Sequence, residues 1–160
     1  MRRAVARALG SIAERIEHVG STSVPGLAAK PILDLDIVLA VGADMREVIE
    51  ALRPLGYRHD GDRRVAGREA FSRIDGEVPW TSERREWMEH HLYACERDSE
   101  ELARHLAFRD HLRRHGSDAR HYAALKCELA ARFRDDREGY CLAKTDFIER
   151  VLRKSSGNAD

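Results

Sequence analysis

Two acidic residues inside an otherwise apolar segment constrain this chain more than any other feature. Asp34 and Asp36 lie in the run ILDLDIVLAV at residues 32–41, whose β-prone residues predict a largely buried strand. Alternate side chains of a strand point the same way, so both carboxylates share one face, about 7 Å apart at Cα. Such a pair repels and is costly to desolvate, and a divalent cation relieves both penalties. We therefore predict Asp34 and Asp36 as ligands of Mg²⁺ and as catalytic residues; two acids facing solvent on an edge strand are the alternative.

A turn rich in hydroxyl groups precedes this strand. Gly20 and Ser21 open the stretch GSTS, which offers several backbone N–H groups and three hydroxyls, the equipment for holding phosphate oxygens. Lys30 comes immediately before the acidic strand. We expect Gly20, Ser21, Thr22 and Lys30 to contact a phosphate, with an ordinary turn as the alternative interpretation.

Lysine is rare in a chain that otherwise uses arginine, with four lysines against 24 arginines. Lys126 and Lys144 each follow a tyrosine by four residues (Tyr122 and Tyr140), so each pair lies on one face of a predicted helix. A ring beside an ammonium group suits a nucleotide base and its phosphate. In the alternative interpretation the tyrosines pack in the core and the lysines extend to solvent.

Two further assignments have open alternatives. No third carboxylate is obvious beside Asp34 and Asp36, so His91 in HHLYAC is the expected third metal ligand, with Glu69 and Glu77 as the acids near strands. Arg109 contacts a phosphate or else forms a helix-surface ion pair with its neighbour Asp110, which is the commoner arrangement.

These motifs resemble a known family. The segment EHVGSTSVPGLAAKPILDLDIVL is similar to the hallmark of the GrpB family, which is also found fused behind dephospho-CoA kinase. The blocks HHLYAC, HLAFRDHLRRH, YAALKCELA and YCLAKTDFI follow in that family's order. A glycine-serine turn followed by Asp-x-Asp also resembles the nucleotidyltransferase fold of DNA polymerase β-like enzymes. The resemblance extends from about residue 16 to residue 152. An enzyme of that fold has a third carboxylate on a neighbouring strand, which is the point where this chain departs.

The expected architecture is α+β: a nucleotidyltransferase-like small mixed sheet with flanking helices and a C-terminal helical bundle. We expect one domain over residues 1–152, sheet-rich at about 16–95 and helical at about 99–152, with a disordered tail at 153–160. Spacing predicts a helix over residues 2–16, strands near 16–19, 70–74 and 90–95, and a loop over 75–89. Asp44 with Glu47 predicts a capping box, Gly56 a helix end, and Ser117-Asp118 and Asp135-Asp136 predict two helix starts. The last of these helices is expected to bury Leu142.

Composition narrows the class of protein. Lys+Arg and Asp+Glu balance at 28 each, which argues against a generic nucleic-acid binder. No apolar run reaches the length of about 18 residues that predicts a membrane span. The three cysteines lack paired metal spacings and indicate reduced thiols in a cytoplasmic protein.

From these features we expect a Mg²⁺-dependent protein that binds a nucleoside triphosphate and transfers a nucleotidyl group to an unidentified acceptor. One alternative is a non-catalytic module that holds a nucleotide or CoA-type phosphate. Another is a regulatory or toxin–antitoxin partner that makes its contacts through the helical half.

Overall fold

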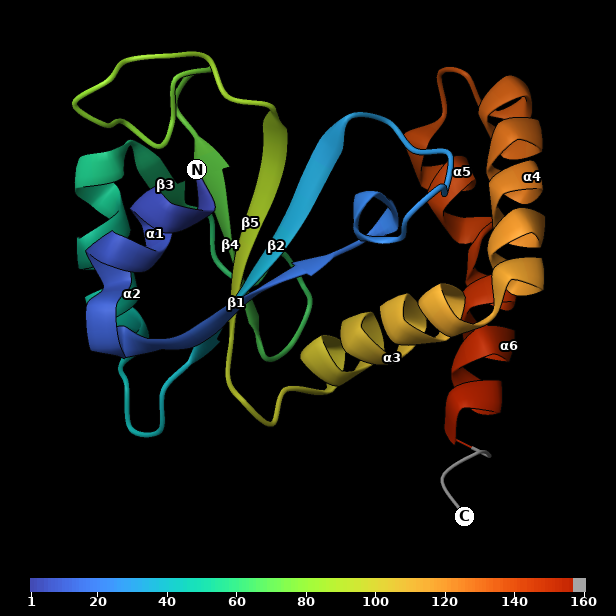
Figure 1. The fold of residues 1–160 in the computed structure, drawn as a ribbon, viewed down its shortest axis with the longest axis horizontal. Helices are drawn as coiled ribbons and strands as arrows, with labels where there is room; N and C mark the ends of the chain where they lie inside the picture. The colour runs from blue at the N-terminus through green and yellow to red at the C-terminus, as the bar shows by residue number, and fades with distance from the viewer. Residues whose placement is uncertain (157–160) are drawn as a thin grey trace.

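The computed structural model describes residues 1–156 and contains one mixed five-stranded sheet. Its strands are β1 (Ala13–Val19), β2 (Ile32–Leu39), β3 (Tyr57–His59), β4 (Arg68–Arg73) and β5 (Glu89–Cys95), in the order β1-β2-β5-β4-β3. β2 and β5 run parallel, and the other neighbouring strands are antiparallel. With helices on both sides, this is the expected α+β architecture (Figure 1).

The helices fall into two groups. α1 (Arg2–Leu9) and α2 (Met45–Leu52) cover one face of the sheet and bury the main core with it. α3 (Glu100–Arg114) leads from the other face to α4 (Gly116–Arg132), α5 (Arg137–Leu142) and α6 (Thr145–Ser156), which make up the helical half (Figure 1). Short 3₁₀ turns occupy residues 10–12, 21–23 and 53–55. Among the described residues, no helix has both the length and the apolar character needed to span a bilayer.

β2 points its two acids away from the main core, as its alternation predicts. Leu35, Ile37 and Leu39 pack into the core beneath α1 and α2. Val38 points the other way and joins Cys95 of β5 and Leu102 of α3 in a smaller core, so the acidic face of β2 looks toward α3. The expectation that Asp34 and Asp36 share a face is therefore confirmed.

Two expected boundaries of the sheet-rich half differ from the structure. The helix predicted over residues 2–16 ends at Leu9, because Gly10 adopts a φ of 52° that a helix does not allow. The chain then becomes β1 at Ala13, and Ile16 reaches the core from a strand instead of from a helix. Helical and strand spacing both place Ile12 and Ile16 toward apolar surroundings, which explains the error.

The C-terminal half also departs from expectation. The last predicted helix is two helices, α5 and α6, separated at residues 143–144, and Leu142 is exposed instead of buried. The tail expected from residue 153 does not begin there, because residues 153–156 continue α6. The remainder of that expected tail, residues 157–160, lies outside the described residues.

Most of the predicted helix ends are confirmed. Asp44 and Glu47 form the capping box of α2, Gly56 adopts a left-handed conformation, and Asp136 caps α5 through the N–H of Gly139. The start predicted at Ser117-Asp118 is wrong by one or two residues, because α4 begins at Gly116. The Asp118 carboxylate instead contacts His111 of α3 and Lys154 of α6.

Arg109 ties the helical half to the sheet. Its Nη1 donates to Glu17 Oε2 at 2.7 Å and to the backbone oxygen of His18 at 3.1 Å, both on β1. Its Nε donates to Asp110 Oδ1 at 2.7 Å. The side chain is only 11% exposed. The structure therefore gives Arg109 the ion-pair arrangement, extended to a contact between α3 and β1.

We expect Arg109→Lys to lower the free energy of unfolding by about 1–2 kcal/mol, because one ammonium cannot reproduce a guanidinium that donates to three acceptors. Arg104→Lys on the same helix is the matched control: Arg104 pairs with Glu149 but is 46% exposed, so its replacement should change stability little. Urea denaturation measures both. If both substitutions change the free energy of unfolding equally, Arg109 does not have this structural role.

Candidate functional site

Asp34 lies where the glycine-serine turn, β2 and β5 meet. His91 is its partner in the parallel register, and His91 Nδ1 is 2.9 Å from Asp34 Oδ1. On the other side, a Cβ placed on Gly20 would be only 2.1 Å from Asp34 Oδ2, and Gly20 has a φ of 68°. The turn therefore passes Asp34 at a separation that only glycine permits. The two motifs found in the sequence form one site.

Asp36 is wholly buried and is held by a histidine of α3. Its Oδ2 is 2.6 Å from His105 Nδ1, and His105 Nε2 is 3.2 Å from Glu101 Oε1. Burial lowers the pKa of His105, but the hydrogen bonds to Asp36 and Glu101 outweigh it and raise this pKa to about 9. His105 is thus an imidazolium at neutral pH. The remaining Asp36 oxygen, Oδ1, has no hydrogen-bond partner among the described residues.

Lys126 brings a buried ammonium group to the glycine-serine turn. Its Nζ donates to Ser21 Oγ at 2.8 Å and to the backbone oxygen of Ala28 at 2.7 Å. Both acceptors are uncharged, and the residue is only 9% exposed. Burial, followed by repulsion from Lys144, lowers the pKa of Lys126 to about 8. Within residues 1–156 no carboxylate pairs with this ammonium, which is unusual for a buried cation.

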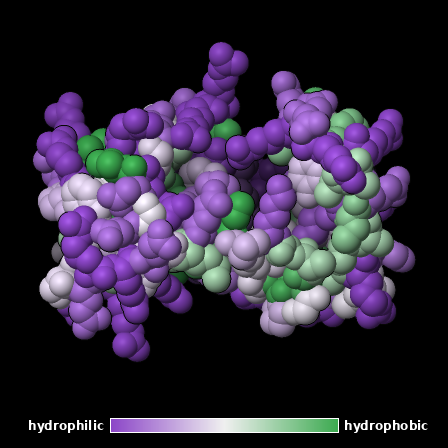
Figure 2. Space-filling view, turned by 90° about the horizontal axis from the view of Figure 1, so that it is seen from above, coloured by the Kyte–Doolittle hydropathy of each residue, from purple (hydrophilic) through white to green (hydrophobic). Residues whose placement is uncertain are grey.

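Lys144 supplies a second ammonium group to the same place. Burial lowers the pKa of Lys144. The charge of Asp34 raises this pKa, and the charge of Lys30 lowers it. Its Nζ lies 4.1 Å from the centre of the Tyr140 ring, and within residues 1–156 it has no hydrogen bond or ion pair. Seen from above, the sheet-rich and helical halves flank a hollow with mainly hydrophilic walls (Figure 2). We use the name lysine cleft for the group Gly20, Ser21, Lys30, Lys126 and Lys144, because Lys126 bonds to Ser21 and is repelled by Lys144, which Lys30 also repels.

Three of the other expected phosphate contacts have partners within the fold. Thr22 Oγ1 donates to the backbone oxygen of Ile32 at 3.0 Å and holds the turn. The Tyr122 ring is buried between Phe108 and Phe147, so the core interpretation of this tyrosine fits the structure. Arg109 binds β1, as described above.

Of the three alternatives for a third metal ligand, only His91 lies beside Asp34. Glu69 is opposite Ala94 on the other face of the sheet, where its carboxylate contacts His59 at 2.7 Å. Glu77 lies in the loop before β5 and pairs with Arg84 at 2.7 Å. The expected grouping of Asp34 with His91 is thus present, although as a hydrogen-bonded pair.

Whether these residues suit Mg²⁺ depends on what else is bound. No group of three or more His, Cys, Asp or Glu side chains within residues 1–156 is placed to hold a metal ion. However, Mg²⁺ is usually held by only one or two carboxylates together with substrate phosphates. Asp34 is 30% exposed, and the Oδ1 atom of Asp36 has a free lone pair on the same face of β2. The acids therefore fit a cation that arrives with phosphate.

Sequence reasoning missed His105, the partner of Asp36. It lies between Leu102 and Leu106, two residues that pack in the core beside β2, so the block HLAFRDHLRRH holds a histidine near an apolar helix face. That pattern is a usable signal for a buried histidine. It does not identify the carboxylate that this histidine contacts.

Comparison with known proteins finds similar proteins in other organisms. UPF0157 protein PA4798 of Pseudomonas aeruginosa is 38% identical over 140 residues, which are 88% of this chain and 54% of that protein. UPF0157 protein YqkA of Bacillus subtilis is 34% identical over 134 residues, which are 84% of this chain and 36% of that protein. The chain thus spans about half of the first relative and about a third of the second.

A solved structure and a family model agree with these matches. The crystal structure of the conserved protein GrpB from Enterococcus faecalis is similar with a TM-score of 0.77 and 29% identity, covering 96% of this chain and 86% of that one. The family model described as GrpB protein matches residues 1–154. On this coverage, the chain belongs to the GrpB family.

Proposed function

We propose that this protein binds the phosphate groups of a nucleotide in the lysine cleft. The observation that carries the proposal is the Lys126 ammonium, which is buried, donates to two uncharged oxygens beside the Tyr122 ring, and is repelled by Lys144. A phosphate group between Lys126 and Lys144 supplies the missing negative charge and strong acceptor oxygens. The N–H groups of the Gly20–Ser21 turn add donors to the same anion.

A nucleotide is the best-supported source of that phosphate. The glycine-serine turn lies against the acidic strand, the arrangement that resembles nucleotidyltransferases. Tyr140 is half-buried beside Lys144 and offers a ring on which a base can stack. Binding without turnover is favoured over transfer because Asp34 and Asp36 are each held by a histidine.

Replacing Lys144 tests this proposal most cleanly, because its ammonium has no other hydrogen bond to lose. We expect Lys144→Met to weaken ADP binding by about tenfold or more, because one charge-assisted hydrogen bond to phosphate is lost. The stability of the free protein should be unchanged. Isothermal titration calorimetry measures the affinity.

Lys154→Met is the matched control, since Lys154 lies in the same half, pairs with Asp118 and has a side chain that is 49% exposed. This variant should bind ADP as the unmodified protein does. If Lys144→Met binds ADP with unchanged affinity, or if both variants lose the same affinity, the lysine cleft is not the phosphate site.

The lowered pKa of Lys126 predicts a pH dependence. Phosphate binds the protonated amine, which prevails in the free protein below its pKa of about 8. Above that pH a proton must be taken up on binding, so affinity should fall by up to about tenfold per pH unit. Lys144 is the other nearby amine, so the fall should become shallower, without vanishing, in Lys126→Met. ADP affinity that stays constant from about pH 7 to pH 9.5 would contradict this assignment.

A second candidate function, Mg²⁺-dependent nucleotidyl transfer, is favoured by the unpartnered Oδ1 of Asp36 on the face that carries Asp34. When bound, the cation would neutralise charge that develops on the phosphates. With Mg²⁺ and a cell extract that supplies the acceptor nucleophile, release of pyrophosphate from labelled ATP above the extract background, abolished in Asp34→Asn, is the expected result. If the protein binds ADP but releases no pyrophosphate at any Mg²⁺ concentration, the transfer function is rejected and only the binding function remains.

A further inference from the structure

Ser21 differs from the other two hydroxyl residues of the glycine-serine turn. Thr22 Oγ1 and Ser23 Oγ each donate to a backbone oxygen, at 3.0 Å and 2.6 Å. Ser21 Oγ has one hydrogen-bond partner among the described residues, Lys126 Nζ at 2.8 Å. Ser21 is half-buried, whereas Ser23 is buried. The hydroxyl proton of Ser21 is therefore the one in this turn that is not donated to the backbone.

Lys126 is placed to accept that proton. A side chain can act as the base of a nucleophile when it lies within hydrogen-bond reach and a third group orients it. Lys126 Nζ meets both conditions, because it is 2.8 Å from Ser21 Oγ and 2.7 Å from the backbone oxygen of Ala28. Burial, followed by Lys144, lowers the pKa of Lys126 to about 8, although Cys127 acts in the opposite sense. Neutral amine is therefore available close to neutral pH.

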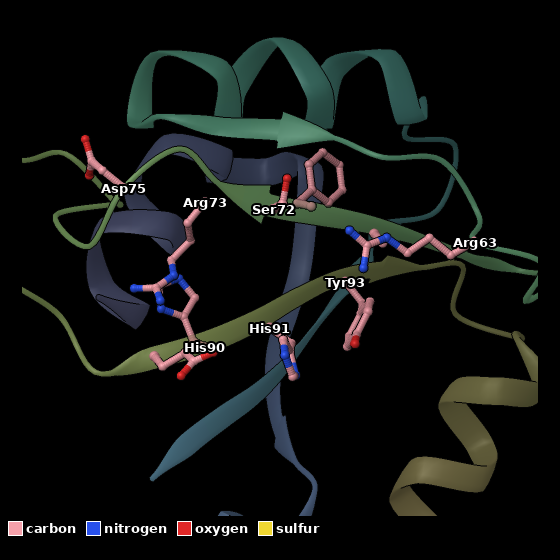
Figure 3. Close-up of a pocket in the computed structure, with 10 residues that line it drawn as sticks. Arg63, Ser72, Arg73, Asp75, His90, His91 and Tyr93 are labelled. Carbon is pink, nitrogen blue, oxygen red and sulfur yellow. The ribbon is translucent and has the colours of Figure 1, made fainter. Parts of the chain in front are cut away.

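A second serine with a charged partner shows what such a pair requires. Ser72 lines a cavity of about 260 Å³ beside β4 and β5 (Figure 3), and its Oγ donates to Asp60 Oδ1 at 3.1 Å. Burial raises the pKa of Asp60, but hydrogen bonds from Arg58, Arg63 and Ser72 outweigh it and lower this pKa. A carboxylate stabilised in this way is a poor base. Lys126 differs, because no carboxylate within residues 1–156 pairs with it.

We propose that Ser21 is a nucleophile that takes an acyl group from an acyl nucleotide, with Lys126 as its general base. This inference rests on the proposed function, because the nucleotide phosphate occupies the lysine cleft. An acyl nucleotide is a mixed anhydride of a carboxylic acid and a nucleotide phosphate, so its reactive carbonyl carbon is next to a phosphate group. It is the class of substrate that uses both a serine–lysine pair and a cationic cleft.

The atoms and charges of this step balance within the site. Ser21 Oγ forms a bond to the carbonyl carbon, and its proton moves to Lys126 Nζ. The bond from that carbon to the phosphate oxygen breaks, and the nucleoside monophosphate leaves with the electron pair. Its phosphate gains a negative charge just as Lys126 becomes an ammonium group beside Lys144. The cleft thus stabilises the leaving group more than the substrate, as catalysis requires.

No bond at phosphorus is broken, so this step is distinct from nucleotidyl transfer. The products are an ester on Ser21 and a free nucleoside monophosphate. The single negative charge of the substrate phosphate is held by Lys144 and the N–H groups of the turn while Lys126 is neutral.

Acetyl-AMP is the probe that tests the proposal on the full chain. The unmodified protein should accelerate release of AMP, and mass spectrometry after acid quenching should find an acetyl ester on Ser21. Ser21→Ala should release AMP only at the rate in buffer, and should still bind ADP because both lysines remain. Ser72→Ala is the matched control and should release AMP as the unmodified protein does, since Asp60 does not activate Ser72.

Lys126→Arg separates the base from the phosphate contact. Arginine keeps the positive charge but does not give up its proton. We expect this variant to release AMP about 100-fold more slowly, the contribution typical of a general base, while ADP affinity falls by about tenfold at most.

Three outcomes would overturn the proposal. They are AMP release by the unmodified protein no faster than in buffer, an unchanged rate in Ser21→Ala or Lys126→Arg, and acetyl groups found on lysines alone. If the unmodified protein still binds ADP in these cases, the phosphate site stands and only the acyl transfer is rejected. Absence of ADP binding would reject the proposed function itself.

Discussion

The hydrogen bond between Asp36 and His105 is the interaction on which the rest of this structure depends. It joins a wholly buried carboxylate in the centre of the sheet to the first helix of the helical half. Removing one partner of such a buried pair typically costs about 3–5 kcal/mol, because the other charge is left uncompensated. By fixing α3 on the acidic face of β2, the pair determines where α4 and α5 bring Lys126 and Lys144 relative to the glycine-serine turn.

This pairing gives the two acids of β2 different roles. From the sequence, repulsion between Asp34 and Asp36 is the reason to expect a metal ion. In the structure, an imidazolium on Asp36 and a second histidine beside Asp34 offset that repulsion without one. Asp36 then acts mainly in joining the two halves. Asp34 stays partly exposed at the cleft, where its charge also acts on Lys144.

The sequence predicted features that depend on local pattern. The acidic face of β2, the capping box at Asp44 and the pairing of each tyrosine with the lysine four residues later all follow from residue spacing. It did not predict contacts between distant segments, such as His105 with Asp36, because spacing does not say which helix packs on which face. The direct contact of Lys126 with Ser21 was missed for the same reason, since the two residues are 105 positions apart. The helix predicted through residue 16 failed where apolar spacing fits helix and strand equally well.

The central claim is that the lysine cleft is a phosphate site assembled from both halves of the chain. A crystal structure of the protein with Mg²⁺ and a non-hydrolysable ATP analogue tests it most directly. The account predicts phosphate oxygens within hydrogen-bond distance of Lys126 Nζ and Lys144 Nζ and of the N–H groups at Gly20 and Ser21. A nucleotide bound elsewhere, with Lys126 still donating only to Ser21 and Ala28, would contradict it.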